Sequence, residues 1–261
     1  MSRSAAIDTL LDQAPQLWRG REPNRSQQTL ATGHSRLDAR LPGGGWPVGA
    51  LTELIAARPG LGEFSVLLPA LAQLSRAGQW LVFIDPPWIP YPAALHGRGL
   101  ALERVLWVRT EGAQESLWAC EQALAAGRGG AVLAWPELSW RKPVGFARLR
   151  RLQLAAEAGA KPAFLFRPED AATAASPAAL RLRLNAAARP DDPACDATGR
   201  DGTRVDILKC RGERPRQPTW LPPHHPFGQA APRHAATQPE ANDPRTPAAS
   251  GRPEADSTPL N

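Results

Sequence analysis

The hydrophobic positions of the chain follow two patterns that alternate from residue 29 onward: short continuous apolar runs, and longer stretches with helical spacing. Continuous runs are typical of strands buried on both faces, and helical spacing is typical of helices that cover a sheet. The runs predict strands at 29–33, 50–57, 79–85, 104–110, 130–135 and 162–167, and the spaced stretches predict helices at 64–78, 111–127 and 146–159. This alternation predicts an α/β fold with a mostly parallel central sheet flanked by helices.

Two further segments, 179–187 and 203–210, alternate apolar and polar residues with a period of two. This pattern predicts strands with one wet face, which add an antiparallel extension to the sheet. Ahead of the sheet, the apolar residues of segment 4–18 share one helical face and predict a short amphipathic helix. Such a helix packs on its own domain or docks a partner or a neighbouring subunit, and both interpretations stay open. Its candidate contact residues are Leu10, Leu11, Leu17 and Trp18.

The end of the chain is rich in proline. Eleven of the 28 prolines lie in positions 212–261, and past Phe227 the only large apolar residue is Leu260. Such a segment buries too little apolar surface to offset the entropy lost on ordering. We therefore predict three parts: an N-terminal helix and linker at 1–28, one α/β domain at 29–226, and a disordered proline-rich tail at 227–261.

Several classes of protein are excluded by simple features of the sequence. No run of eighteen apolar residues occurs, so no membrane-spanning segment is predicted. The first residues lack the apolar core of a signal peptide. The three cysteines, Cys120, Cys195 and Cys210, form no CxxC pair, which argues against a disulfide scaffold or a zinc site. These observations predict a cytoplasmic protein that holds no metal.

Positive charge is concentrated in one segment of the predicted domain. The chain carries 31 basic and 25 acidic residues, and residues 141–151 hold five positive charges and no acid. Arginine and lysine neutralise nucleic-acid phosphates, so these side chains are candidates for DNA contact. An ordinary solvated helix face is the alternative, because such faces are routinely charged. The candidates are Arg141, Lys142, Arg148, Arg150 and Arg151.

The loop after the predicted strand 50–57 is where an α/β sheet would bind a phosphate. A phosphate-binding loop of the pattern GxxxxGK[ST] uses its lysine to reach the phosphates and its hydroxyl to hold magnesium. Here Glu63 stands in the lysine position and Phe64 in the hydroxyl position. Like charges 4 Å apart repel by about 4 kcal/mol at the dielectric of a protein surface. We expect no nucleotide cofactor at this degenerate loop, which comprises Arg58, Pro59, Gly60, Gly62 and Glu63.

The order of these segments resembles the ATPase core of the RecA recombinase. The resemblance begins with TGHSRLDARLPGGGWPVGALTE at 32–53 and continues through the later strands as far as residue 209. Where a RecA-type ATPase has its catalytic glutamate this chain has Pro87, and where it has its magnesium aspartate the strand ends in Trp135 and Pro136. The resemblance therefore implies a RecA-like core that has lost its ATPase and is no enzyme. A nucleotide-binding regulator with an atypical loop is an alternative.

Six segments resemble the ImuA family, RecA-like proteins of bacterial mutagenic translesion synthesis. The most specific are LPGGGWP at 41–47 and DPPWIPYP at 85–92; the others are WRG at 18–20, PGLGE at 59–63, LLPALA at 67–72 and WLP at 220–222. This resemblance implies a non-enzymatic accessory or scaffold protein of the SOS response, without catalytic residues or cofactors. It implies two partners, an ImuB-type inactive Y-family polymerase homologue and, through that complex, an error-prone DnaE-type polymerase. Some members of the family are described as similar to the cell-division inhibitor SulA.

The resemblance leaves other associations open. It implies that the protein joins the nucleoid when DNA is damaged. Self-association is one open possibility, and direct action on DNA as a RecA-like binding module is another.

Tryptophan is frequent, with nine residues against one tyrosine. Trp80, Trp107 and Trp135 lie in or at the ends of predicted strands, so we expect them in the core. Trp46 and Trp88 lie in loops that we expect near the ligand-binding end of the sheet. We expect Trp46 to cover the vacant phosphate site and Trp88 to anchor a partner, because tryptophan is enriched at the strongest points of interfaces.

Overall fold

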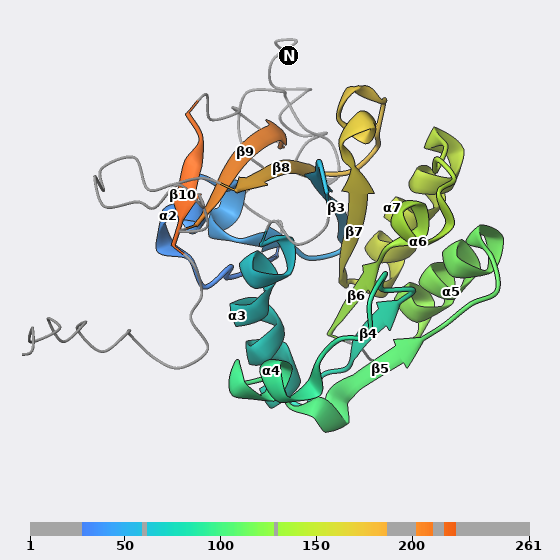
Figure 1. The fold of residues 1–261 in the computed structure, drawn as a ribbon, viewed down its shortest axis with the longest axis horizontal. Helices are drawn as coiled ribbons and strands as arrows, with labels where there is room; N and C mark the ends of the chain where they lie inside the picture. Colours follow the sequence, from blue (N-terminus) through green and yellow to red (C-terminus); the bar gives the residue numbers. More distant parts are fainter. Residues whose placement is uncertain (1–27, 59–61, 128–129, 187–201, 211–216, 223–261) are drawn as a thin grey trace, which may run out of the picture. The chain divides into compact units, whose positions relative to one another are not determined.

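An eight-stranded sheet forms the centre of the protein, shown as a computed structural model in Figure 1. The structure describes residues 28–58, 62–127, 130–186, 202–210 and 217–222. Six adjacent strands are parallel; across the sheet they are β8 (Leu180–Ala186), β3 (Ala50–Ala56), β7 (Pro162–Pro168), β6 (Ala131–Ala134), β4 (Leu81–Ile84) and β5 (Val105–Val108). Beyond β8 the sheet continues with β9 (Thr203–Lys209) and β10 (Thr219–Leu221), both paired antiparallel.

The predicted fold class is confirmed: the sheet is mostly parallel, helices flank it, and antiparallel strands extend it. β8 is parallel to β3 and antiparallel to β9, so it joins the two parts of the sheet. The wet face expected for the segment 179–187 is wrong at Arg181, whose side chain is buried. The period-two pattern could not predict this, because an arginine can be buried where it pairs with an acid of the neighbouring strand.

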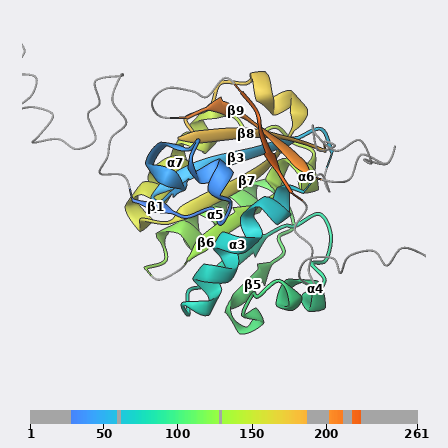
Figure 2. The ribbon, with the colours of Figure 1, turned by 90° about the vertical axis from the view of Figure 1, so that its left-hand side faces the viewer.

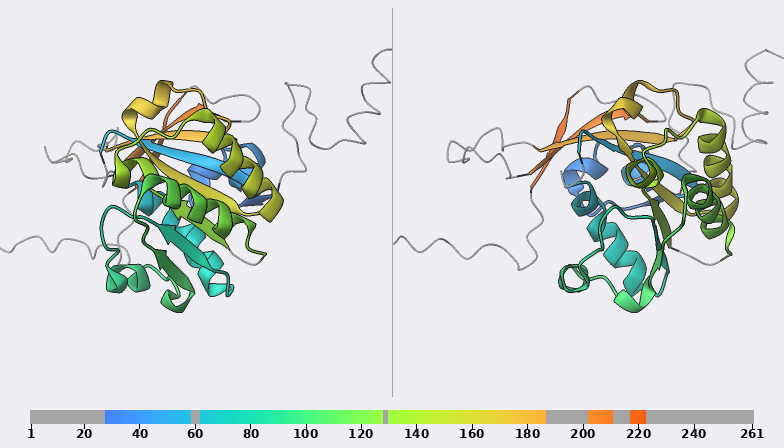
Figure 3. Two further views of the ribbon diagram at one scale, coloured as in Figure 1. Left: turned by 90° about the vertical axis from the view of Figure 1, so that its right-hand side faces the viewer. Right: turned by 45° about the vertical axis from the view of Figure 1, so that its right-hand side comes forward.

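Helices cover both faces of the sheet, as the two opposed views in Figures 2 and 3 show. α3 (Glu63–Arg76) packs on one face together with the short α2 (Ser35–Asp38), and these elements share one apolar core with the strands. α5 (Ala113–Ala125) and α7 (Phe146–Gly159) pack on the other face around a second apolar core. Strands covered in this way need apolar residues on both faces, which explains their continuous apolar runs.

Short elements connect these layers, and most of them carry no sequence period long enough to predict. They are β1 (Thr29–Leu30), which pairs with β2 (Trp46–Pro47), and η1 (Pro42–Gly44), α4 (Pro92–Gly97), η2 (Leu102–Arg104), α6 (Pro136–Trp140) and η3 (Glu169–Thr173). α6 and η3 follow the carboxyl ends of β6 and β7, and so they shape the end of the sheet where ligands usually bind.

The tryptophans correct part of the prediction. Trp135 is buried as expected, but Trp80 and Trp107 are exposed. Trp107 is exposed because β5 lies at the edge of the sheet and has one strand neighbour, whereas Trp80 directly precedes β4. Trp46 is wholly buried and meets Phe164 edge to face at 5.5 Å. It precedes the first residue of β3, so it lies toward the amino ends of the parallel strands. The expectation that Trp46 covers a phosphate site is therefore wrong.

α7 buries fewer apolar side chains than the spacing of its apolar residues predicts. Leu149, Leu152 and Ala156 face the sheet, whereas Phe146 and Leu154 are exposed. Leu154 lies ~140° around the helix from Leu149, at 100° per residue, so both cannot face the same surface.

Some predicted features lie outside the described residues. These are the helix at 4–18, with Leu10, Leu11, Leu17 and Trp18, and the tail at 227–261. They stay predictions. None of the helices in the described ranges has both the length and the apolar character that crossing a membrane requires.

Candidate functional site

The carboxyl ends of β3, β4, β6 and β7 meet on one side of the sheet, where a parallel α/β fold usually binds its ligands. The degenerate loop follows β3 there. Arg58 is exposed, Pro59 and Gly60 lie outside the described residues, and Glu63 is buried at the first turn of α3. Gly62 has φ +90°, and a Cβ on it would lie 2.2 Å from the Thr203 hydroxyl oxygen, so the entry to α3 requires glycine.

An aromatic hollow occupies the space beyond this loop. Its volume is about 350 Å³, and α3, the segment 86–91 and α4 surround it. Phe64 meets Phe83 edge to face at 5.6 Å, and Trp135 stacks on Phe166 at 4.2 Å. The aromatic residues that line the hollow are Phe64, Phe83, Trp88, Tyr91, Trp135 and Phe166. This surface suits an apolar side chain from another molecule far better than a phosphate.

Asp85 holds the base of the segment 86–91. It is buried at the end of β4 with φ +50°, a conformation that residues other than glycine seldom adopt. Its carboxylate accepts hydrogen bonds from the Thr110 N–H at 2.8 Å, the Thr110 hydroxyl at 2.7 Å and the Trp140 indole N–H at 3.3 Å. A strained conformation of this kind persists only where the surroundings enforce it, as these three donors do.

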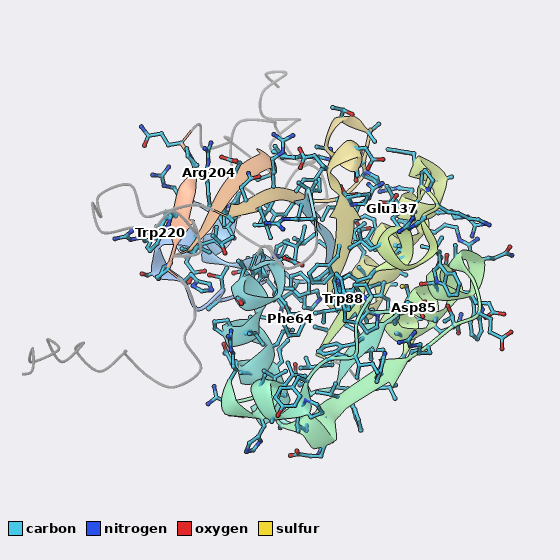
Figure 4. All side chains as sticks on the ribbon, in the orientation of Figure 1. Phe64, Asp85, Trp88, Glu137, Arg204 and Trp220 are labelled. Atoms are coloured by element: carbon cyan, nitrogen blue, oxygen red, sulfur yellow. The ribbon has the colours of Figure 1, made fainter. Side chains whose placement is uncertain are left out.

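The segment held by Asp85 exposes three large apolar side chains. Trp88 is 62% exposed, Ile89 69% and Tyr91 71%. Side chains of this size are rarely left together in water unless they serve contact with another molecule. Figure 4 labels Phe64, Asp85, Trp88 and Glu137 around this end of the sheet, while the labelled Arg204 and Trp220 belong to the antiparallel strands β9 and β10.

A second, basic hollow lies on the other side of Trp88. Its volume is about 840 Å³, and Trp88, α6, the segment 141–146 and η3 line it. Arg141 and Lys142 are exposed on its rim, together with one acid, Asp170. The structure therefore brings the partner candidate Trp88 together with two of the five basic candidates.

The other three basic candidates lie apart from the basic hollow. Arg148, Arg150 and Arg151 are exposed on α7 and line neither hollow. Arg151 forms an ion pair with Glu121 of α5 at 2.5 Å. The basic segment thus divides into a pair beside Trp88 and a group on α7.

Beneath the basic hollow lies a buried ion quartet of Glu53, Arg167, Glu137 and Arg181. Glu53, in the middle of β3, accepts hydrogen bonds from Arg167 at 2.8 Å and from Arg181 at 2.5 Å. Arg167 also donates two hydrogen bonds to Glu137, at 2.7 and 2.8 Å. Burial alone would lower the pKa of Arg167, but its bonds to Glu137 and the charge of Glu53 raise it. Two acids and two bases thus neutralise one another inside the protein.

Sequence reasoning missed this quartet. One signal was available: Thr52 and Glu53 interrupt a strand that is otherwise apolar. A carboxylate buried between two strands requires a cation from a neighbour, and that neighbour is unknown until the strand order is known. Among the described residues, no group of three or more His, Cys, Asp or Glu side chains could hold a metal ion.

Comparison with known proteins gives a family for the segment that forms these hollows. A family model described as "Cell division inhibitor SulA" matches residues 49–161. A relative from Yersinia enterocolitica serotype O:8 with the same description is 31% identical over 121 residues, which are 46% of this chain and 68% of the relative. The chain belongs to the SulA family.

Other SulA relatives match the same part of the chain. The SulA of Photorhabdus laumondii subsp. laumondii is 32% identical over 120 residues, 46% of this chain and 64% of the relative. The SulA of Edwardsiella piscicida is 33% identical over 111 residues, 42% of this chain and 63% of the relative. This chain therefore spans somewhat less than two thirds of these two relatives.

The SulA match contains most of the candidate site. Residues 49–161 begin just before β3 and end just before β7, so they include Asp85, Trp88, Arg141 and Lys142. Arg167, Arg181 and η3, which complete the quartet and the basic hollow, lie beyond its end.

The quartet makes a prediction about stability. Replacing Glu53 by glutamine leaves two buried arginines with one anion, so Glu53→Gln lowers the free energy of unfolding by about 3–5 kcal/mol. The matched control is Glu169→Gln, which removes an exposed partner of Arg183 paired at 2.9 Å. That change lowers the free energy of unfolding by less than about 1 kcal/mol. Urea denaturation measures both values, and equal losses in the two variants would contradict the prediction.

Proposed function

We propose that the protein is a non-enzymatic accessory protein of DNA-damage-induced mutagenic translesion synthesis, and that it acts by docking a partner protein on the Trp88 surface. That surface comprises the exposed side chains Trp88, Ile89 and Tyr91 with the neighbouring Arg141 and Lys142. The observation that carries the proposal is the exposure of three large apolar residues on a segment whose base is held by a buried carboxylate. A rigid aromatic group beside positive charge is the usual composition of an interface anchor.

A binding role, rather than catalysis, fits the side chains at this end of the sheet. Glu63 and Phe64 stand where a phosphate-binding loop has its lysine and hydroxyl, and Phe64 packs on Phe83. The Asp85 carboxylate is held by the donors of Thr110 and Trp140, and Glu137 is held by Arg167. These acids support the protein's own structure, which favours a RecA-like domain without ATPase activity.

The resemblance of DPPWIPYP to ImuA supplies the partner that we propose for the Trp88 surface. That partner is an ImuB-type inactive Y-family polymerase homologue, and an error-prone DnaE-type polymerase would join through the same complex. A cytoplasmic location with recruitment to the nucleoid after damage accompanies this function.

Inhibition of cell division is a second candidate function, because the relatives that match residues 49–161 are described as cell division inhibitors. The same exposed segment would then dock a component of the division machinery. The two candidate functions predict different cellular phenotypes.

The partner proposal predicts an effect of a single side chain. Trp88→Ala weakens binding of the purified ImuB-type protein by about 2 kcal/mol, roughly thirtyfold in Kd. Trp118→Ala is the matched control, because Trp118 on α5 is also 62% exposed. That variant binds as tightly as the unchanged protein. Isothermal titration calorimetry gives both values, and size exclusion at micromolar concentration checks complex formation.

Two results would count against the partner proposal. Failure of the unchanged proteins to form a complex removes the partner, and equal binding by Trp88→Ala and Trp118→Ala removes the surface. Unfolding curves of both variants should match that of the unchanged protein, since each substitution removes an exposed side chain.

A cell-based measurement separates the two candidate functions. If the protein serves translesion synthesis, deleting its gene lowers the frequency of damage-induced mutations, and overproducing the protein leaves cell length unchanged. If it inhibits division, overproduction yields long undivided cells and deletion leaves the mutation frequency unchanged. In the first case Trp88→Ala lowers the frequency of damage-induced mutations as the deletion does, and in the second case overproducing Trp88→Ala leaves cell length unchanged. Trp118→Ala behaves like the unchanged protein in both cases.

Direct DNA binding stays a prediction for the basic residues of α7. Arg148 and Arg150 are exposed there, whereas Arg151 already pairs with Glu121. If α7 contacts DNA, the double change Arg148→Ala and Arg150→Ala reduces the slope of log affinity against log salt by about 2. Arg151→Ala should change it less. Fluorescence anisotropy over a range of salt concentrations measures the slope, and unaltered affinity in the double variant would exclude this contact.

A further inference from the structure

Trp88 is a shared wall of the aromatic hollow and the basic hollow. Its side chain, together with that of Pro87, lines both of them. Their volumes, about 350 and 840 Å³, are typical of binding pockets. An extended peptide advances by about 3.3 Å per residue, so residues close together in one segment that crosses Trp88 can reach both hollows. The two hollows are therefore open to one ligand.

The aromatic hollow favours an uncharged apolar side chain. Rings form much of its wall, and Phe83 meets Trp135 edge to face at 6.3 Å. One base and one acid line it, Arg98 and Glu63, so their charges balance. Arg98 donates a hydrogen bond to the Ser65 hydroxyl at 3.3 Å, which holds it beside the hollow. Ring edges and faces of this kind attract aromatic and large aliphatic groups.

The basic hollow favours a negative charge. Arg141 and Lys142 are exposed on its rim, and within the described ranges neither side chain has an ion-pair or hydrogen-bond partner. Arg151 on α7, by contrast, is already paired with Glu121. The rim carries these two positive charges against the single negative charge of Asp170. Guanidinium and ammonium groups bind carboxylates through strong charge-assisted hydrogen bonds.

The backbone beneath the two cations is held at both ends by one buried acid. Arg141 has φ +50°, and its N–H donates to the Glu137 carbonyl at 2.8 Å. Three residues later the Val144 N–H donates to the Glu137 carboxylate at 2.5 Å. Cations held in this way lose less entropy when a ligand binds.

A further hydrogen bond joins this basic segment to the Trp88 segment. Trp140 directly precedes Arg141 and donates its indole N–H to the Asp85 carboxylate at 3.3 Å. Asp85 in turn holds the base of the segment that carries Trp88. The fold therefore sets the spacing between the aromatic hollow and the cations, and a ligand that reaches both must match that spacing.

A peptide suits the two hollows better than a nucleic acid does. Proteins that bind single strands use a basic groove that follows the phosphates. Here two cations lie beside Asp170, and the basic residues of α7 line neither hollow. Much of the rest of the basic hollow is aliphatic and offers nothing to a phosphate; it includes Leu138, Val144, Ala171, Ala174 and Ala175.

We propose that the two hollows bind one segment of a partner protein in which a large apolar residue lies close to one or more acids. The apolar side chain fills the aromatic hollow, and a carboxylate on the other side of Trp88 pairs with Arg141 and Lys142. This inference rests on the proposed docking role of the Trp88 surface and adds the chemistry of the segment that docks there.

Selection from a phage-displayed library of random linear peptides, with the full chain as the target, tests the proposal. We expect the enriched peptides to combine acids with a nearby aromatic or large aliphatic residue. Replacing the acids of an enriched peptide by their amides, or its apolar residue by alanine, should each raise its Kd by about tenfold or more in fluorescence anisotropy.

Charge reversal in the protein locates the acidic end of the peptide. Arg141→Glu combined with Lys142→Glu raises the Kd of the enriched peptide by about tenfold or more. The matched control is Arg148→Glu combined with Arg150→Glu, which changes the net charge equally at exposed residues outside both hollows and leaves most of the affinity. A peptide with lysines in place of its acids should bind the Arg141 and Lys142 reversal more tightly than the original peptide does, which also shows that this variant is folded.

Several results would overturn the inference. The selection could enrich no peptide, or only peptides without acids, or the reversal on α7 could weaken binding as much as the reversal at Arg141 and Lys142. If oligo(dT) displaces the peptide and loses its own affinity in the Arg141 and Lys142 reversal, the basic hollow binds nucleic acid instead. Failure of the ImuB-type protein to bind is a separate result: it removes that partner from the proposed function, while the selected peptides still decide the chemistry of the two hollows.

Discussion

Glu53 is a carboxylate buried in the middle of the sheet, and it constrains which strands can lie beside β3. It lies in register with Arg181 on β8 and with Leu165 on β7, two residues before Arg167. An acid without a cation would be too costly at this depth, and here both flanking strands supply an arginine. The central order β8, β3, β7 and its register satisfy this requirement. The ion quartet therefore links strand order to electrostatics.

The quartet also connects the core to the surface on which function is proposed. Arg167 joins Glu53 to Glu137 of α6, and Glu137 in turn accepts a hydrogen bond from the Val144 N–H at 2.5 Å. The segment that carries Arg141 and Lys142 is thus tied to the sheet at both of its ends. Asp85 gives the Trp88 segment the same kind of support. Binding residues held on a rigid base lose less entropy when a partner docks.

The parallel sheet presents two different surfaces, one at the carboxyl ends of its strands and one at its edge strand β5. Its carboxyl ends present aromatic groups where nucleotide-binding members of this fold class present polar loops. Its β5 edge presents a strand with one neighbour and exposed side chains on both faces. Both surfaces lie largely within the segment that matches the SulA family. The surface at the carboxyl ends is suited to contact with protein through its side chains.

The sequence by itself determined the order and type of the main elements, because apolar periodicity is a local property of the chain. It also determined that residues 58–64 lack the lysine and the hydroxyl of a phosphate-binding loop, since residue identity alone decides that. Only the tertiary structure decided that Glu53 meets Arg167 and Arg181, that Trp46 is core, and that Trp80 and Trp107 are exposed. Burial and ion pairing depend on which strands become neighbours and which become edges, and no local pattern encodes that choice.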